Sequence, residues 1–532
     1  MQTVNSYNTS LFFSNQNSYD ISDVQVLKIT DTDSTEFDYY YMYGTTKTYE
    51  FYAYRSKNLS DWQPVTQMTG GKAAFTPGKE NYCTDYLWAP EVIYDEKTDK
   101  YYMFYSGRNK SKTAVNGIEP LEIGLAVANE PYGPFTAYTD DIHDSSTPLF
   151  DGDKINESLG ENDKTDIFTC IDPHPFVAQD GTKYLYFSRS NDPGAGYKQA
   201  IYGIKMDDWA KPDYKTLTRL TRNGYLTVDG TEIANYENDG PANEGPFMYE
   251  QRNSDGTYKY YLTLSIGDYQ NKSYSVIQAV SDSPLGKFRK LTEAEGGILL
   301  SSNHSEWDNI SGPGHHSFIE VGDELVVAYH KHTNPSTGGV DRTFAFDRVC
   351  ITENINGESV LYVNGPTTSV QPGFEEFSNF KNIAPEAKVS ISNGINAFAL
   401  TDGLLSLYNN IDYIKEYESA GNATILLEFD NFREITALMI YNSKSFDRAF
   451  SKINHIEFQC IEDGIKTPVV NYIDDLQFDW KAYKTEIGNV MRPGGSATAA
   501  FTPMMIKSIK IELESISNQD IIALSEIVVL GK

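Results

Sequence analysis

Five tyrosine-rich runs recur along the first two thirds of the 532-residue chain, and this repeat constrains the fold more than any other feature. The runs are dense in residues that favour β-strands, and they read DYYYMYGT, KYYMFYSG, TKYLYFSRS, YKYYLTLS and ELVVAYH. Each follows a short apolar segment led by a polar residue, and the leading residues are Asp23, Glu91, Asp172, Glu244 and His315. Their spacings of 68, 81, 72 and 71 residues indicate repeated units of about 70 residues.

The second and fourth units also resemble each other internally. The segments AVANEPYGPF and AVSDSPLGKF share Ala, Val, Pro, Gly and Phe in register, and each begins 35 residues after the leading acid of its unit. A unit of this length holds about four strands and cannot bury both faces of a small sheet alone, so the units must stack radially. Five units predict a five-bladed β-propeller over residues 1–375.

The composition of the sequence changes after the fifth unit. Residues 360–380 are rich in turn formers and lack the tyrosine repeats, so we expect a domain boundary there. Residues 381–532 contain short alternating runs that suffice for two packed antiparallel sheets: KVSISN, ATILLEF, ITALMIYN, HIEFQCI, SIKIELESI and EIVVLGK. Because helix-period patterns are scarce, the prediction is an all-β chain, a propeller followed by a β-sandwich.

The net charge of the chain limits the kinds of partner that it can bind. A formal net charge of −30 repels phosphate backbones and anionic headgroups, so nucleic-acid and membrane partners are disfavoured. The four cysteines are widely spaced and form no CxxC pair, which predicts buried, reduced thiols.

We expect a monomer. The opening MQTVNSYNTSLFF lacks the pattern of a secretion signal, so the compartment stays open: cytoplasmic if the chain is complete, secreted if a signal was removed.

The propeller geometry brings the leading residues together. The innermost strand of each blade runs along the central axis, so residues at the same end of these strands converge on one small pocket. Burying several carboxylates there is costly unless they are paired, protonated or solvated. Catalysis is therefore a better reason for the cluster than stability.

The motifs IDPHPF and NEGPFMY, together with Asp23, carry a family resemblance. The first 370 residues or so resemble glycoside hydrolase family 43, five-bladed propeller enzymes that act on arabinose-, xylose- and galactose-containing plant polysaccharides. The family's second and third acids correspond to Asp172 in IDPHPF and Glu244 in NEGPFMY. Its first acid usually precedes Pro, whereas Asp23 precedes Val24. The repeat register favours Asp23, with Asp20 as the alternative.

The resemblance also implies roles for these acids. Inverting hydrolysis of a glycosidic bond needs one carboxylic acid to protonate the leaving oxygen and one carboxylate to deprotonate water on the opposite sugar face. The family pattern assigns Asp23 as the base and Glu244 as the acid. Asp172 would then raise the pKa of Glu244, because a nearby anion disfavours ionisation.

Further site residues follow from the same resemblance. Trp88 in the WAP motif is expected to flank the sugar and Arg342 to bind it, with core packing as the alternative for Trp88. Glu91 is either a substrate hydrogen-bonder or a structural acid. His315 in GPGHHS corresponds to a histidine near a central metal or water cluster, so one calcium ion at the axis is expected, with a plain hydrogen-bonding histidine as the alternative.

The expected activity is exo-hydrolysis of terminal α-L-arabinofuranosyl residues from plant oligosaccharides or polysaccharides. The alternatives are a β-xylosidase, a galactofuranosidase or galactanase, and, in a different class, a non-catalytic carbohydrate-binding propeller. The closing domain resembles discoidin-like, galactose-binding jelly rolls through NIAPEAKVSIS, ALTDGLL and ALSEIVVLGK. Such a domain either binds sugar as a carbohydrate-binding module or buttresses the propeller.

Overall fold

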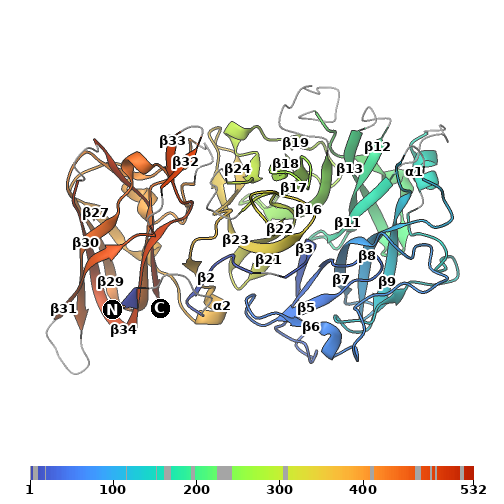
Figure 1. The fold of residues 1–532 in the computed structure, drawn as a ribbon, viewed down its shortest axis with the longest axis horizontal. Helices are drawn as coiled ribbons and strands as arrows, with labels where there is room; N and C mark the ends of the chain where they lie inside the picture. The colour runs from blue at the N-terminus through green and yellow to red at the C-terminus, as the bar shows by residue number, and fades with distance from the viewer. Residues whose placement is uncertain are drawn as a thin grey trace.

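The chain is almost entirely β-structure, as predicted (Figure 1). The computed structural model describes residues 2–3, 10–17, 19–114, 117–150, 152–160, 169–192, 198–224, 242–303, 310–407, 412–461, 469–479, 482–485, 488–515 and 520–532. Within these ranges the α-helices are two short segments, α1 (Gly152–Ser158) and α2 (Glu375–Ser378). No helix in the described part of the chain is long and apolar enough to cross a bilayer.

Five antiparallel sheets form the blades of the predicted propeller. The first contains β3 (Ser22–Lys28), β4 (Tyr40–Thr45), β5 (Ala53–Ser56) and β6 (Gln63–Pro64). The second contains β7 (Trp88–Asp95), β8 (Lys100–Arg108), β9 (Leu121–Ala128) and β10 (Thr136–Ala137). The third contains β11 (Thr169–Val177), β12 (Lys183–Asp192), β13 (Lys198–Asp208), β14 (Lys211–Pro212) and β15 (Thr218–Arg219).

The remaining two blades complete the ring. The fourth contains β16 (Asn243–Arg252), β17 (Tyr258–Ile266), β18 (Ser275–Ser281), β19 (Arg289–Lys290) and β20 (Ile298–Leu300). The fifth contains β21 (Gly314–Val321), β22 (Glu324–His332), β23 (Arg342–Glu353) and β24 (Ser359–Val363). Each first strand packs against the next blade, and β21 packs against β3, so the ring closes.

The tyrosine-rich runs are the second strands of the blades, and their rings fill the space between neighbouring sheets. Tyr41, Tyr43, Tyr101 and Tyr105 belong to one buried cluster shared by the first two blades. Buried tyrosine needs a hydrogen-bond acceptor for its hydroxyl; Tyr43, for example, donates to the carbonyl of Pro131 at 2.6 Å. Carboxylates near these strands also act as acceptors, as Glu36 does for the hydroxyl of Tyr41 at 2.6 Å.

Every inner strand carries a β-bulge at the same place. The register shifts by one residue near the start of β3, β7, β11, β16 and β21. At each bulge one residue has a left-handed backbone, and these are Asp23, Ala89, Asp172, Gly245 and His315. Bulges re-aim side chains and are frequent beside active sites.

The bulges also join the blades. The second-strand residue that pairs with the residue before each bulge is Thr45, Ser106, Ser188, Ser265 or His330. Four of these side chains accept the bulge N–H of the next blade: Thr45 from Ala89, Ser106 from Asp172, Ser265 from His315 and His330 from Asp23, at 2.8–3.1 Å. Ser188 instead donates to the carbonyl of Asn243, at 2.8 Å. At every interface, the side chain at this position therefore forms a hydrogen bond to the backbone of the next blade.

The bulges correct the repeat alignment made from sequence. Glu91 lies two residues beyond the bulge residue Ala89, and Glu244 lies one residue before Gly245. The leading residues of the sequence pattern therefore do not all occupy equivalent backbone positions. An alignment that matches polar side chains places β7 and β16 out of register with the other inner strands. The bulge residue is Ala in β7 and Gly in β16, and neither has a polar side chain that would mark the bulge.

The C-terminal region contributes eight strands to a nine-stranded antiparallel sheet, whose ninth strand comes from the start of the chain, and one large buried cluster forms its core. A separate two-stranded sheet contains β32 (Ala482–Thr485) and β33 (Gly488–Met491). Its long strands are β29 (Ala423–Asn442), β34 (Ser496–Leu513) and β35 (Ile522–Gly531). The others are β26 (Lys381–Asn382), β27 (Lys388–Ile391), β28 (Tyr417–Ser419), β30 (Lys452–Ile461) and β31 (Val469–Gln477). The sequence runs ATILLEF and ITALMIYN, expected as two strands, are the two halves of β29. The first half pairs with β27 and the second half with β35.

The two parts of the chain are in direct contact. Phe12 and Val370 from the propeller side pack with Met439, Tyr441 and Leu530 of the C-terminal sheet. The first described strand, β1 (Gln2–Thr3), pairs with β34, and β2 (Phe12–Phe13) pairs with β25 (Gln371–Pro372). The beginning of the chain therefore lies with the C-terminal sheet, and the packing supports the buttressing alternative.

We predict that the hydrogen bonds between blades contribute to stability. Ser265→Ala leaves the buried N–H of His315 without its acceptor, which should reduce the free energy of unfolding by about 1–3 kcal/mol. Urea unfolding followed by tryptophan fluorescence measures this loss. Ser254→Ala, at an exposed turn, is the matched control. Equal stability of the two variants would contradict the structural role of the bond.

Candidate active site

Left-handed backbone geometry places three predicted site residues at one end of the axis. Asp23, Asp172 and His315 have φ of 52°, 58° and 40°. This conformation costs a residue other than glycine about 1–3 kcal/mol and is common at functional sites. The ionisable side chains interact with one another across three different blades. The structure thus brings together what the repeat predicted to converge.

Asp23 is a buried carboxylate held by cations. Its Oδ1 accepts a hydrogen bond from Arg342 Nη1 at 3.1 Å and lies 3.5 Å from His315 Nδ1. Burial alone disfavours ionisation, but Arg342 and His315 outweigh it and hold the pKa of Asp23 well below its usual range. Asp23 is therefore ionised at neutral pH. The alternative acid, Asp20, is exposed.

Glu244 has the opposite tendency. Burial and the negative charge of Asp172 raise the pKa of Glu244 to about 7. Its Oε1 accepts a hydrogen bond from the Tyr274 hydroxyl at 2.8 Å, and its Oε2 accepts one from Gln199 Nε2 at 3.3 Å. Near neutral pH a large fraction of Glu244 therefore carries a proton that it can donate.

Asp172 connects the two carboxyl groups. Its Oδ2 accepts a hydrogen bond from the backbone N–H of Gly245, next to Glu244, at 3.0 Å. Burial raises the pKa of Asp172, and the anion of Asp23 adds to this. A Cβ on Gly245 would lie 3.1 Å from the His315 ring, so glycine permits the close approach between these two strands.

His315 balances charge at the centre of the cluster. Burial opposes protonation of its ring, but the carboxylates of Asp23, Asp172 and Glu244 raise its pKa. With Arg342 it supplies the positive charge that three neighbouring carboxyl groups require.

The other predicted residues lie at different depths. Trp88 is partly exposed at the head of β7, with its ring centroid 5.6 Å from that of Tyr86. Glu91 is buried and lies 2.8 Å from His174 Nδ1 in the packing between blades. This contact supports the structural alternative for Glu91, while sugar stacking by Trp88 stays a prediction.

Three residues at the site escaped the sequence analysis. Tyr274 and Gln199 contact Glu244, and His330 contacts Asp23. Gln199 lies on β13, His330 on β22 and Tyr274 just before β18, and no motif marks these positions. The available signal was the polar end of the apolar run ELVVAYH, which contains His330.

The calcium ion expected at the axis stays a prediction. Calcium takes six to eight oxygen ligands, but no group of three or more His, Cys, Asp or Glu in the described ranges is arranged to hold a metal ion. His315 presents Nδ1 to Asp23, and its environment favours the protonated ring, which has no free lone pair. We therefore assign no catalytic step to a metal ion.

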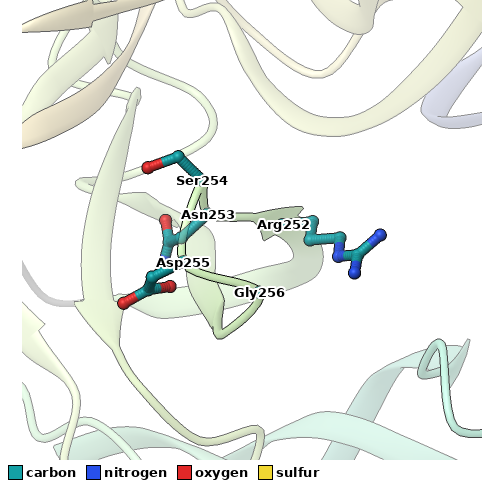
Figure 2. Close-up of a pocket in the computed structure, with 5 residues that line it drawn as sticks. All are labelled: Arg252, Asn253, Ser254, Asp255 and Gly256. Carbon is teal, nitrogen blue, oxygen red and sulfur yellow. The ribbon is translucent and has the colours of Figure 1, made fainter.

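A shallow pocket lies away from this cluster, at the turn between β16 and β17 (Figure 2). It is lined by Arg252, Asn253, Ser254, Asp255 and Gly256. Glu244 lies at the opposite end of β16. Each residue of a strand adds about 3.3 Å to its length. The hairpin pocket is thus separate from the carboxylates.

Comparison with known proteins gives the family. The sequence profile of glycosyl hydrolases family 43 matches residues 27–355, a range that begins just after Asp23 and includes Asp172, Glu244 and His315. A solved thermostable family-43 glycoside hydrolase is 30% identical with a TM-score of 0.50, over 66% of this chain and 95% of that one.

Two characterised relatives are more distant. Xylosidase/arabinosidase 43A of Humicola insolens is 24% identical over 304 residues, 53% of this chain and 77% of that protein. Beta-D-galactofuranosidase xynD of Aspergillus niger is 24% identical over 190 residues, 35% of this chain and 44% of that protein. The family profile covers more than half of the chain, and the protein is therefore a glycosidase that belongs to glycosyl hydrolases family 43.

Proposed function

We propose that the protein is an inverting exo-glycosidase that removes terminal α-L-arabinofuranosyl residues from plant polysaccharides or oligosaccharides. The observation that carries the mechanism is the different surroundings of two carboxyl groups in one cluster: Asp23 Oδ1 accepts a hydrogen bond from Arg342 Nη1 at 3.1 Å, whereas Glu244 has the carboxylate of Asp172 and the hydroxyl of Tyr274 as neighbours. Asp23 is held ionised by Arg342 and His315, while burial and Asp172 raise the pKa of Glu244 to about 7. An ionised base and a protonated acid are the pair that single displacement requires.

Each group has one task in this mechanism. Asp23 accepts a proton from water, and the water oxygen forms a bond to the anomeric carbon as the glycosidic C–O bond breaks. Glu244 gives its proton to the departing oxygen. The two residues come from the first and fourth blades, and His315 of the fifth blade interacts with both. Inverting hydrolysis requires a separation of about 6.5–9.5 Å between the two carboxyl groups, so that sugar and water fit between them.

The choice of glycone rests on relatives. The name of the Humicola insolens relative includes both arabinosidase and xylosidase, and the Aspergillus niger relative is named a galactofuranosidase. These names fit all three glycones, and we propose arabinofuranose as the first choice, with β-xylose and galactofuranose as the alternatives. Trp88 would form a wall of the sugar subsite.

We predict that the two carboxyl variants differ in their dependence on the leaving group. Glu244→Gln should slow hydrolysis of an unactivated disaccharide by about 10²–10⁴-fold, and that of a 4-nitrophenyl glycoside far less, because nitrophenolate needs little protonation. Asp23→Asn should slow both substrates strongly, since no water is activated. Steady-state kcat values test this. Unchanged kcat in Asp23→Asn would remove Asp23 from the role of base.

We predict opposite shifts of the pH profile in two further variants. Asp172→Asn removes the anion that raises the pKa of Glu244, so Glu244 ionises earlier and the alkaline limb of kcat moves to lower pH. Tyr274→Phe removes a hydrogen bond that favours the ionised form, so the limb moves to higher pH. Shifts in the same direction would show that Glu244 does not set this limb.

We predict an inverted product from the preferred glycoside. The wild type should hydrolyse 4-nitrophenyl α-L-arabinofuranoside faster than the corresponding β-xyloside and β-galactofuranoside. Proton NMR of the first-formed sugar should show the anomer opposite to that of the substrate. A retained anomer would contradict single displacement, and a faster xyloside or galactofuranoside would replace the proposed glycone.

A further inference from the structure

One of the five side chains that join the blades differs from the rest. At the equivalent position the other four blades have a hydroxyl: Thr45, Ser106, Ser188 and Ser265. The fifth blade has His330, which is fully buried. An imidazole is larger than a hydroxyl and has a flat face, so it can form a second contact in addition to the hydrogen bond.

The hydrogen bond of His330 holds the proposed base. Its Nδ1 accepts the backbone N–H of Asp23 at 3.1 Å. Burial keeps the ring neutral by lowering its pKa to about 3. In a neutral ring whose Nδ1 accepts, Nε2 carries the proton. The ring orientation is therefore set by the bulge that displays the Asp23 carboxylate.

The flat face of His330 holds the partner of the proposed acid. The rings of His330 and Tyr274 are parallel to within 2°, with centroids 5.5 Å apart. Tyr274 is buried and donates its hydroxyl to Glu244 Oε1 at 2.8 Å. The Tyr274 ring is also confined at Gly314, where an added Cβ would lie 2.1 Å from its Cε1.

We propose that His330 is a positioning residue that fixes the base and the acid relative to each other, through Asp23 directly and through Tyr274 for Glu244. The contacts form one line across the pocket: the bulge of β3, the imidazole, the phenol ring and the carboxyl group of β16. Displacement of reacting groups by about 1 Å can cost about 100-fold in rate. The proposal rests on the roles assigned to Asp23 and Glu244, which their own variants test separately.

Two substitutions separate the two contacts of His330. His330→Phe keeps a ring against Tyr274 but removes the acceptor for the Asp23 N–H. We expect kcat to fall by about 100-fold on both the 4-nitrophenyl glycoside and the unactivated disaccharide, because the base moves. His330→Asn keeps an acceptor near the Nδ1 position but removes the ring. We expect its kcat to fall by about 100-fold on the disaccharide and less than about 10-fold on the nitrophenyl glycoside, because only the acid loses its support.

The control removes another buried imidazole from the same blade. His316 contacts Thr263 Oγ1 at 2.6 Å, so His316→Asn should lower the urea midpoint as the His330 variants do but keep equal relative rates on the two substrates. The proposal is overturned if both His330 variants keep the wild-type kcat. It is also overturned if both lose the same factor on both substrates, because His330 would then act only through general core packing.

Discussion

The structure depends on how five inner strands meet at one axis without leaving backbone groups unpaired. Each strand bulges at the same point, and a side chain of the preceding blade joins the strand there. A buried N–H without an acceptor costs about 1–3 kcal/mol, so this set of bonds stabilises the closure of the ring. The same bulges give Asp23, Asp172 and His315 their left-handed backbone and direct their side chains into one cluster. Fold closure and site assembly therefore share one backbone feature.

The charge balance of the cluster gives its members different chemistry. Arg342 and His315 are next to Asp23, while Glu244 has Asp172 as its charged neighbour and a neutral hydrogen-bond donor in Tyr274. Identical functional groups thus acquire opposite protonation from their surroundings, as is typical of acid–base pairs in enzymes. His315, in the position where the family resemblance suggested a metal, can supply positive charge as a protonated ring.

Side-chain type and spacing predicted the repeat and the blade number. They also placed Asp23, Asp172 and Glu244 among the leading residues, while the roles of these acids came from the family resemblance. The sequence did not predict the bulge register in the second and fourth blades, because Ala89 and Gly245 adopt the left-handed backbone without a polar side chain to mark it. His330, on β22, and Tyr274, just before β18, reach the site from outside the repeat's leading segments, so only their three-dimensional contacts reveal them. The sequence also did not predict that β29 is one continuous strand, because a bent strand resembles two short strands in sequence.

We expect Asp23 and Glu244 to differ in protonation at neutral pH, and titration of Glu244 tests this difference directly. Carbon-13 NMR of protein labelled at the glutamate carboxyl carbon, with Glu244→Gln to assign the signal, follows this group through the pH range. One glutamate signal should titrate near pH 7 and be absent from the variant. A Glu244 signal that titrates near the ordinary glutamate value of about 4.3 would contradict this expectation.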